Sequence, residues 1–206
     1  MITLVVSKLR GLLKFRIGEM MLGGLLKKAR RQVLAKQPDE IRLSSQPGYR
    51  WKKPVAMSKL TGPLAARGFI DLGPYSLGVM PEVTVHLLMN PAVSVYACVY
   101  EHAKEGIWLD LTSRYEDGSR ATFTTLRSTC MDQRPQNTVV CAPSASSEAL
   151  YGQMLRERPQ RTLLRLEAVT VIKLFEAAYA EQMRWRESEG VSAGEVGNLA
   201  TTSTRA

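Results

Sequence analysis

Hydrophobic and polar positions alternate with a period of two through the middle of the chain, from Val83 to Leu126. The runs that carry this alternation are rich in β-branched and aromatic residues and are bounded by turn residues, which is typical of β-strands. Because such runs are joined here by short connections, they predict an antiparallel meander. The predicted strands cover residues 83–90, 93–100, 107–112 and 121–126.

The dipeptide Asp117-Gly118 is the strongest turn signal in this region. It predicts a tight hairpin over residues 116–119, in a primed turn with a positive φ at Gly118. Shorter strand-like runs at residues 69–72, 75–80 and 138–141 extend the expected sheet to about residues 69–141.

The pattern changes after residue 141 to apolar spacings of three and four residues, which favour helices. One helix is expected from Ser144 or Ser146 to about residue 158, and a second over residues 167–189 with Phe175 and Tyr179 on its apolar face. The capping sequence Ser192-Ala-Gly-Glu195 predicts a third. Strands followed by helices indicate an α+β fold, with an antiparallel sheet and the C-terminal helices packed on one face.

The first 36 residues predict a basic amphipathic helix that precedes this domain. Its apolar residues recur at helical spacing, and Lys and Arg flank them. The candidate membrane- or partner-binding residues are Lys8, Leu9, Arg10, Leu13, Lys14, Ile17, Met20, Met21, Lys27, Lys28, Arg30 and Arg31.

Net charge separates this segment from the rest of the protein. Residues 1–36 hold nine Lys or Arg and one acidic residue, a net charge of +8 within a total of +9. Any acidic partner is therefore expected to meet the N-terminal segment. An anionic membrane surface and a partner helix both fit it, and so does packing of the apolar stripe on the chain's own domain or on a second copy. Nucleic acid is a weaker alternative because it gives no role to the apolar stripe.

The remaining chain divides by composition. Residues 37–63 are rich in Pro, Gly and Ser and predict a linker, residues 64–200 a single α+β domain, and residues 201–206 a disordered tail. Within the linker, the basic and aromatic sequence 49–54 has two interpretations. It binds an acidic surface or nucleic-acid bases, or it lies over the domain to which it is attached.

Three cysteines without a C-x-x-C spacing argue against a disulfide framework and a cysteine zinc site, and favour a reducing, intracellular compartment. The N-terminal segment fits neither a transmembrane span nor a secretory signal, because charges interrupt its apolar residues. Peripheral membrane attachment is expected, and a mitochondrial targeting segment stays an open alternative.

Candidate chemistry is sparse. The sequence contains no dinucleotide-binding, phosphate-binding, zinc-protease or nucleophile-elbow motif, so no catalytic residue, metal or cofactor is predicted. Arginines 114, 120, 127 and 134 add positive charge near strand ends, and Asp110 shares a strand face with Thr112. A threonine-lined solvated face or a ligand-binding face explains this pattern. The candidate ligand-face residues are Tyr96, Tyr100, His102 and Asp110.

These features lead to three hypotheses. The first is a non-enzymatic α+β module attached to a membrane surface or partner protein through its basic amphipathic N-terminus. The second is a small-ligand-binding protein or enzyme that uses the outer sheet face. The third is a nucleic-acid binder that acts through residues 1–53.

Overall fold

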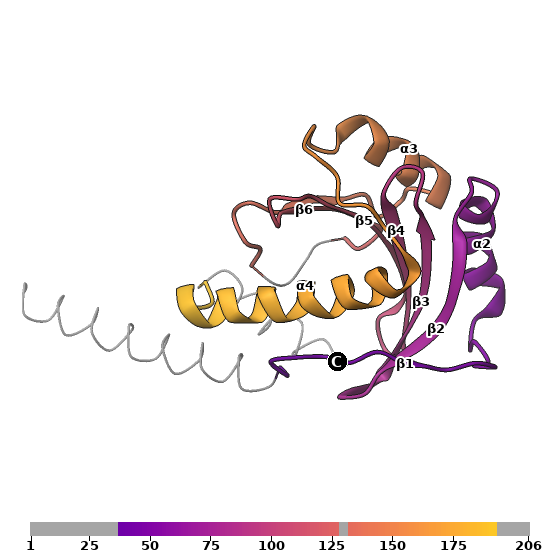
Figure 1. The fold of residues 1–206 in the computed structure, drawn as a ribbon. Helices are drawn as coiled ribbons and strands as arrows, with labels where there is room; N and C mark the ends of the chain where they lie inside the picture. The colour runs from indigo at the N-terminus through magenta and orange to yellow at the C-terminus, as the bar shows by residue number, and fades with distance from the viewer. Residues whose placement is uncertain (1–36, 128–131, 193–206) are drawn as a thin grey trace, which may run out of the picture. The chain divides into compact units, whose positions relative to one another are not determined.

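The computed structural model describes residues 37–127 and 132–192 (Figure 1). The expected N-terminal helix, the expected helix after Ser192 and the tail over residues 201–206 lie outside these ranges. The chain forms two compact units, one of residues 39–185 and one of residues 1–38 together with 186–206. The sheet and the site described below lie in the unit of residues 39–185.

The described residues form one seven-stranded sheet and three helices, and the strands are adjacent in chain order. All neighbouring strands are antiparallel except the last pair, which is parallel. The α+β fold is therefore confirmed. The elements are β1 (Ser44–Ser45), α2 (Pro54–Ala65), β2 (Ile70–Leu77), β3 (Met80–Asn90), β4 (Val95–His102), β5 (Gly106–Arg114), β6 (Arg120–Thr124), β7 (Thr138–Cys141), α3 (Ser147–Glu157) and α4 (Ala168–Glu189).

The meander predicted from the alternating runs is present as β3 to β6. Leu87 pairs with Cys98, Cys98 with Asp110, and Asp110 with Thr124, so one row of side chains crosses four strands. The two short runs expected before it form the single strand β2, which contains irregular pairing near Gly73.

Helices α2 and α3 cover one face of the sheet, and this face is apolar along its centre. Ser146 caps α3 as expected, and its hydroxyl accepts a hydrogen bond from the amide of Ala149 at 3.2 Å. The fully buried side chains of this layer include Leu64, Val95, Val99, Leu109, Leu111, Phe123, Leu150 and Met154.

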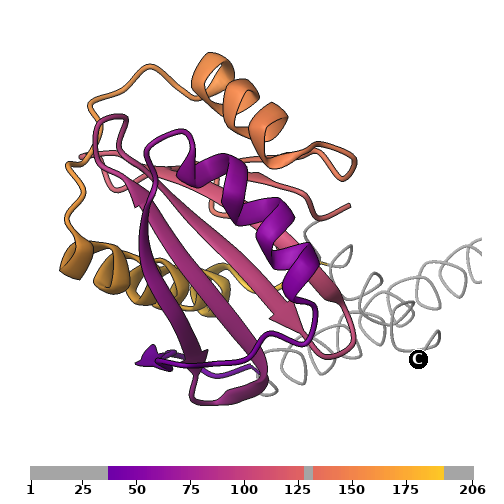
Figure 2. The ribbon, with the colours of Figure 1, turned by 90° about the vertical axis from the view of Figure 1, so that its right-hand side faces the viewer.

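Helix α4 lies on the opposite face, so the C-terminal helices do not share one side of the sheet as expected (Figures 1 and 2). The physical reason is visible in β3, where Leu87, Leu88 and Met89 are successive apolar residues. Successive side chains in a strand point to opposite faces, so both faces need cover. Phe175 and Tyr179 of α4 pack on this side as predicted, although both are only partly buried.

Residues 37–63, expected to be an irregular linker, contain β1 and most of α2. Pro54 occupies the first turn of α2, where a missing N–H costs nothing. No side chain of the segment caps this helix. Instead, the buried carboxylate of Glu101 on β4 accepts hydrogen bonds from the amides of Lys52 at 3.2 Å and Lys53 at 3.0 Å.

The aromatic residues of the sequence 49–54 also contact the domain itself. The Tyr49 hydroxyl donates to Glu101 at 3.1 Å. The ring of Trp51 lies 4.8 Å from that of Tyr49 and 5.5 Å from that of His86. The interpretation in which this sequence lies over its own domain is the one that these contacts favour.

The turn between β5 and β6 contains Gly118 with a φ of +79°, as predicted. It is nevertheless not a primed turn, because Ser94 is the only non-glycine residue with positive φ in the described chain. The amide of Gly118 donates to the carbonyl of Tyr115, and the amide of Tyr115 donates to the carbonyl of Ser119, both at 3.0 Å. This is a three-residue hairpin loop that ends in a left-handed glycine.

We expect Gly118→Val to destabilise the domain by about 1–2 kcal/mol, because a β-branched residue is strained at positive φ. The measurement is chemical denaturation. Gly62→Ala is the matched control, since Gly62 lies in α2 with open space around it and alanine favours a helix. Equal stability of the Gly118→Val variant and the parent would contradict the assignment of this turn.

Candidate functional site

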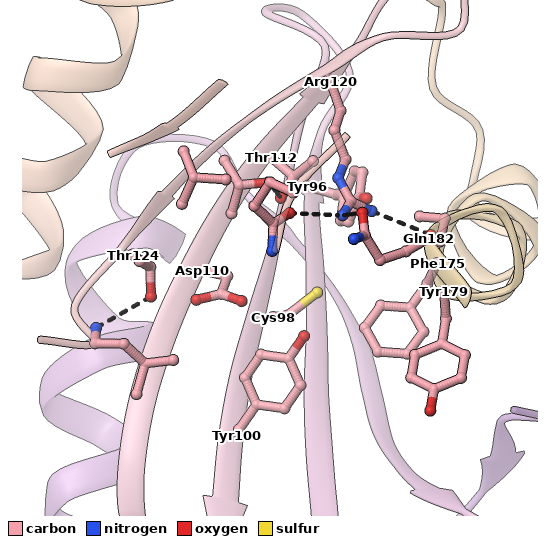
Figure 3. A pocket seen from close by; sticks show the side chains of 15 residues that line it. Tyr96, Cys98, Tyr100, Asp110, Thr112, Arg120, Thr124, Phe175, Tyr179 and Gln182 are labelled. Carbon is pink, nitrogen blue, oxygen red and sulfur yellow. Dashed lines mark hydrogen bonds between the residues drawn. The ribbon is translucent and has the colours of Figure 1, made fainter. Parts of the chain in front are cut away.

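A cavity of about 220 Å³ lies between α4 and strands β4 to β6 (Figure 3). It sits on the polar part of the sheet face that α4 covers. Its lining combines hydroxyl, phenol, thiol, amide and charged groups with aromatic and aliphatic side chains. The lining residues are Tyr96, Cys98, Tyr100, Asp110, Thr112, Arg120, Thr122, Thr124, Leu126, Gln133, Val139, Phe175, Ala178, Tyr179 and Gln182.

The alternation of the strands places the polar residues together. Tyr96, Thr112 and Thr122 form one row across β4, β5 and β6, with the two threonine hydroxyls 3.2 Å apart. Cys98 and Asp110 belong to the next row. The neighbouring strand positions point to the other face and form the apolar layer under α2 and α3. One set of strands therefore builds both a core and a pocket.

Asp110 is the carboxylate of this pocket, and its Oδ1 atom is buried with no hydrogen-bond partner among the described residues. Burial raises the pKa of Asp110 from 3.8 to about 6, against the smaller effects of the Thr124 hydroxyl and the Arg120 guanidinium, which both lower it. The Asp110 carboxylate is therefore ionised at pH 7.5, although its surroundings are poorly solvated.

Arg120 supplies the positive charge. Its Nη1 donates to the carbonyl of Ala178 at 3.3 Å, and its Nη2 lies 3.4 Å from the amide oxygens of Gln133 and Gln182 (Figure 3). Its Nε is buried without a partner in the described chain. Burial lowers the pKa of Arg120, but the group stays protonated at neutral pH.

The phenols and the thiol in the pocket are neutral. Burial is the main cause that raises the pKa of Tyr96, Cys98 and Tyr100. A cysteine nucleophile must be a thiolate, so a protonated Cys98 is unsuited to attack a substrate at neutral pH. These groups provide hydrogen-bonding capacity without charge.

Aromatic rings form one wall of the site. The Tyr100 ring stacks on Trp108 at 4.6 Å with an interplanar angle of 12°, and the Phe175 ring lies 6.3 Å from Tyr100. Leu126 and Val139 add aliphatic surface to the lining. The arrangement suits a small molecule that has both polar groups and an apolar part.

A second charged cluster lies near the pocket residues in sequence, and its opposite charges are paired with one another. Glu181 of α4 binds Arg114 at 3.1 Å and Arg134 at 2.9 Å. Partial burial alone would raise the pKa of Glu181, but the guanidinium groups, Arg114 first, lower it overall. We assign this cluster to stability, because it holds α4 to the end of the sheet.

The structure brings together three of the four candidate ligand-face residues, since Tyr96, Tyr100 and Asp110 all line the cavity. It places His102 elsewhere, at the end of β4, where its Nδ1 accepts hydrogen bonds from the amides of Lys104 at 3.1 Å and Glu105 at 2.9 Å. His102 therefore shapes a hairpin loop. The candidate membrane- or partner-binding residues, Lys8 to Arg31, lie outside the described residues.

Sequence reasoning missed the contributions of α4, namely Phe175, Tyr179 and Gln182, to the site. The apolar face of this helix was recognisable, but its partner strands were not. Arg120 was visible only as one of several arginines at strand ends. Its role depends on a side chain that reaches along the sheet to α4.

The comparisons with protein-family models, curated proteins and solved structures find no match to this chain. Within residues 37–127 and 132–192, no helix has the length and hydrophobicity to cross a membrane. The same residues contain no cluster of three or more His, Cys, Asp or Glu side chains with the arrangement of a metal site.

We expect Asp110→Asn to stabilise the domain at pH 7.5 by about 1–3 kcal/mol. The pKa of Asp110 is about 6 in the folded protein and 3.8 in the unfolded chain. Folding is therefore penalised progressively as pH rises through this window, and asparagine removes the penalty. The advantage of the variant, measured by denaturation, should vanish near pH 4.

The matched control is Asp117→Asn. Hydrogen bonds from the hydroxyl and amide of Ser119, with a smaller contribution from Arg161, lower the pKa of Asp117. This carboxylate stabilises the fold above pH 4, so its removal should have the opposite sign at pH 7.5. Loss of stability in Asp110→Asn at every pH would show that the Asp110 carboxylate is a structural group.

Proposed function

We propose that this protein binds a small molecule in the cavity between α4 and strands β4 to β6. One observation carries the proposal. The cavity is lined by the carboxylate of Asp110 and the guanidinium of Arg120, and neither group has an ion-pair partner among the described residues. Charged groups inside proteins are almost always paired, and an unpaired charge in a cleft is typical of a functional site.

Binding without chemistry is the simplest function for these groups. Cys98 is protonated, and His102 lies at a hairpin loop. An enzyme is the second candidate, on the specific ground that the pKa of Asp110 is about 6. A carboxylate with this pKa is suited to move a proton near neutral pH.

The test is a ligand-observed NMR screen of the full chain against fragments that differ in charge. We expect fragments that bind the parent protein not to bind a Thr122→Phe variant, because the larger side chain fills the cavity. The control is Thr162→Phe, which changes an exposed threonine that does not line the cavity. Both variants must first be shown to be folded, by measuring their unfolding midpoints. If fragments then bind both variants equally well, the cavity is not the binding site.

We also propose that residues 1–36 attach the protein to an anionic membrane surface. The support is the sequence, which concentrates +8 of the net charge of +9 in this segment and places an apolar stripe beside it. A basic amphipathic helix of this kind binds the headgroup region through both features. A partner helix that receives the same stripe is the alternative.

Co-sedimentation of the full chain with phosphatidylserine-containing and pure phosphatidylcholine vesicles tests the attachment. We expect binding to the anionic vesicles, weakened by high salt and by Leu13→Glu, because each engaged Lys or Arg contributes about 1 kcal/mol. Val169→Glu, a change at an exposed valine of α4, is the control. A chain that stays in solution with all vesicles, while Leu13→Glu unfolds it or splits an oligomer, would identify a packing helix.

A further inference from the structure

The two charged side chains that line the cavity determine the net charge of the ligand that fits it. Among the lining residues, Asp110 and Arg120 are the only ones ionised at neutral pH. The lining is therefore neutral overall. A ligand with a net charge would leave one charge unbalanced in a poorly solvated space, which is costly.

Neither ion has an ion-pair partner among the described residues. The salt bridges of the described chain engage other groups, and the contacts of Arg120 are to a carbonyl and to amide oxygens. Glu181 shows the contrast, because it is paired with two guanidinium groups. The cavity thus presents two opposite charges that are near enough to influence one another electrostatically and that are both unpaired.

The two charged side chains define the complement. The carboxylate of Asp110 accepts hydrogen bonds, and the guanidinium of Arg120 donates them. A ligand that satisfies both carries a donor and an acceptor. Charge-assisted hydrogen bonds are roughly twice as strong as neutral ones, so the best complement is an ammonium group for Asp110 and a carboxylate for Arg120.

We propose that the ligand is a small zwitterion, an amino acid or an amino-carboxylate of similar size with an apolar part. This rests on the proposed function of the cavity. The volume of about 220 Å³ lies below the range of drug-sized sites, which limits the ligand to a compact molecule. The wall of Tyr100, Phe175 and Val139 receives its apolar part, and the threonine hydroxyls meet the remaining polar atoms.

The experiment uses the full chain at pH 7.5. The twenty standard L-amino acids and γ-aminobutyrate are first compared by thermal shift. The zwitterion with the largest shift is then titrated by calorimetry beside its N-acetyl derivative, an anion, and its carboxamide derivative, a cation. We expect the zwitterion to bind at least about tenfold more tightly than either derivative, because each derivative leaves one pocket ion unpaired.

Variants separate recognition from stability. In Asp110→Asn, the preference for the zwitterion over the N-acetyl derivative should fall to about onefold, while the preference over the carboxamide remains. Arg120→Gln should give the reverse pattern. These ratios compare ligands on one variant, so they do not depend on its stability. Arg120→Lys, which keeps the charge, provides a second readout if Arg120→Gln fails to fold.

The outcomes distinguish the inference from the proposed function. If no zwitterion binds but an anionic, cationic or neutral fragment occupies the cavity, the zwitterion inference is wrong and the binding function stands. If zwitterions bind with ratios that the Asp110 and Arg120 variants leave unchanged, the inference is also wrong. If no amino acid and no fragment binds the parent protein, or if every bound molecule binds the Thr122→Phe variant equally well, both the zwitterion inference and the proposed binding function are wrong.

Discussion

The alternation of side chains along β4, β5 and β6 is the constraint on which the rest of this structure depends. One set of positions, such as Leu109, Leu111 and Phe123, is apolar and packs under α2 and α3. The other set includes Asp110 and Thr122 and faces α4. A shift of one residue in register would exchange these sets. Correct strand pairing therefore creates the hydrophobic core and the polar cavity in the same step.

The two layers treat buried charge differently. Glu101 is buried but receives two amides and a phenol hydroxyl, and it thereby fixes the start of α2. Asp110 is partly buried, and its Oδ1 atom has no hydrogen-bond partner among the described residues. The first carboxylate stabilises the fold by holding the residues that lead into α2. The second opposes folding above its pKa, and a persistent penalty of this kind is more typical of a binding site than of a core.

The sequence predicted the parts of the fold that local pattern controls. Alternation identified β3 to β6, and the Ser146 cap identified α3. It did not predict α2, because Gly62 and Pro63 lower helix propensity and tertiary contacts stabilise the helix. Nor did it predict that β7 pairs parallel to β6, since pairing direction depends on a crossing connection with no local signal. Tyr96, Tyr100 and Asp110 were named as one candidate face and all three line the cavity, whereas the helix that covers them required the structure.

Cys98 has a consequence for how the motion of this layer can be followed. Its thiol is 2% exposed and lies on the strand face that α4 covers, whereas Cys141 is exposed. A thiol reagent larger than the cavity reaches Cys98 only when the helix separates from the sheet, so the labelling rate reports local opening rather than global unfolding. Cys141 supplies the unprotected reference rate in the same molecule. The labelling rate of Cys98 relative to that of Cys141 therefore measures how often α4 separates from the sheet.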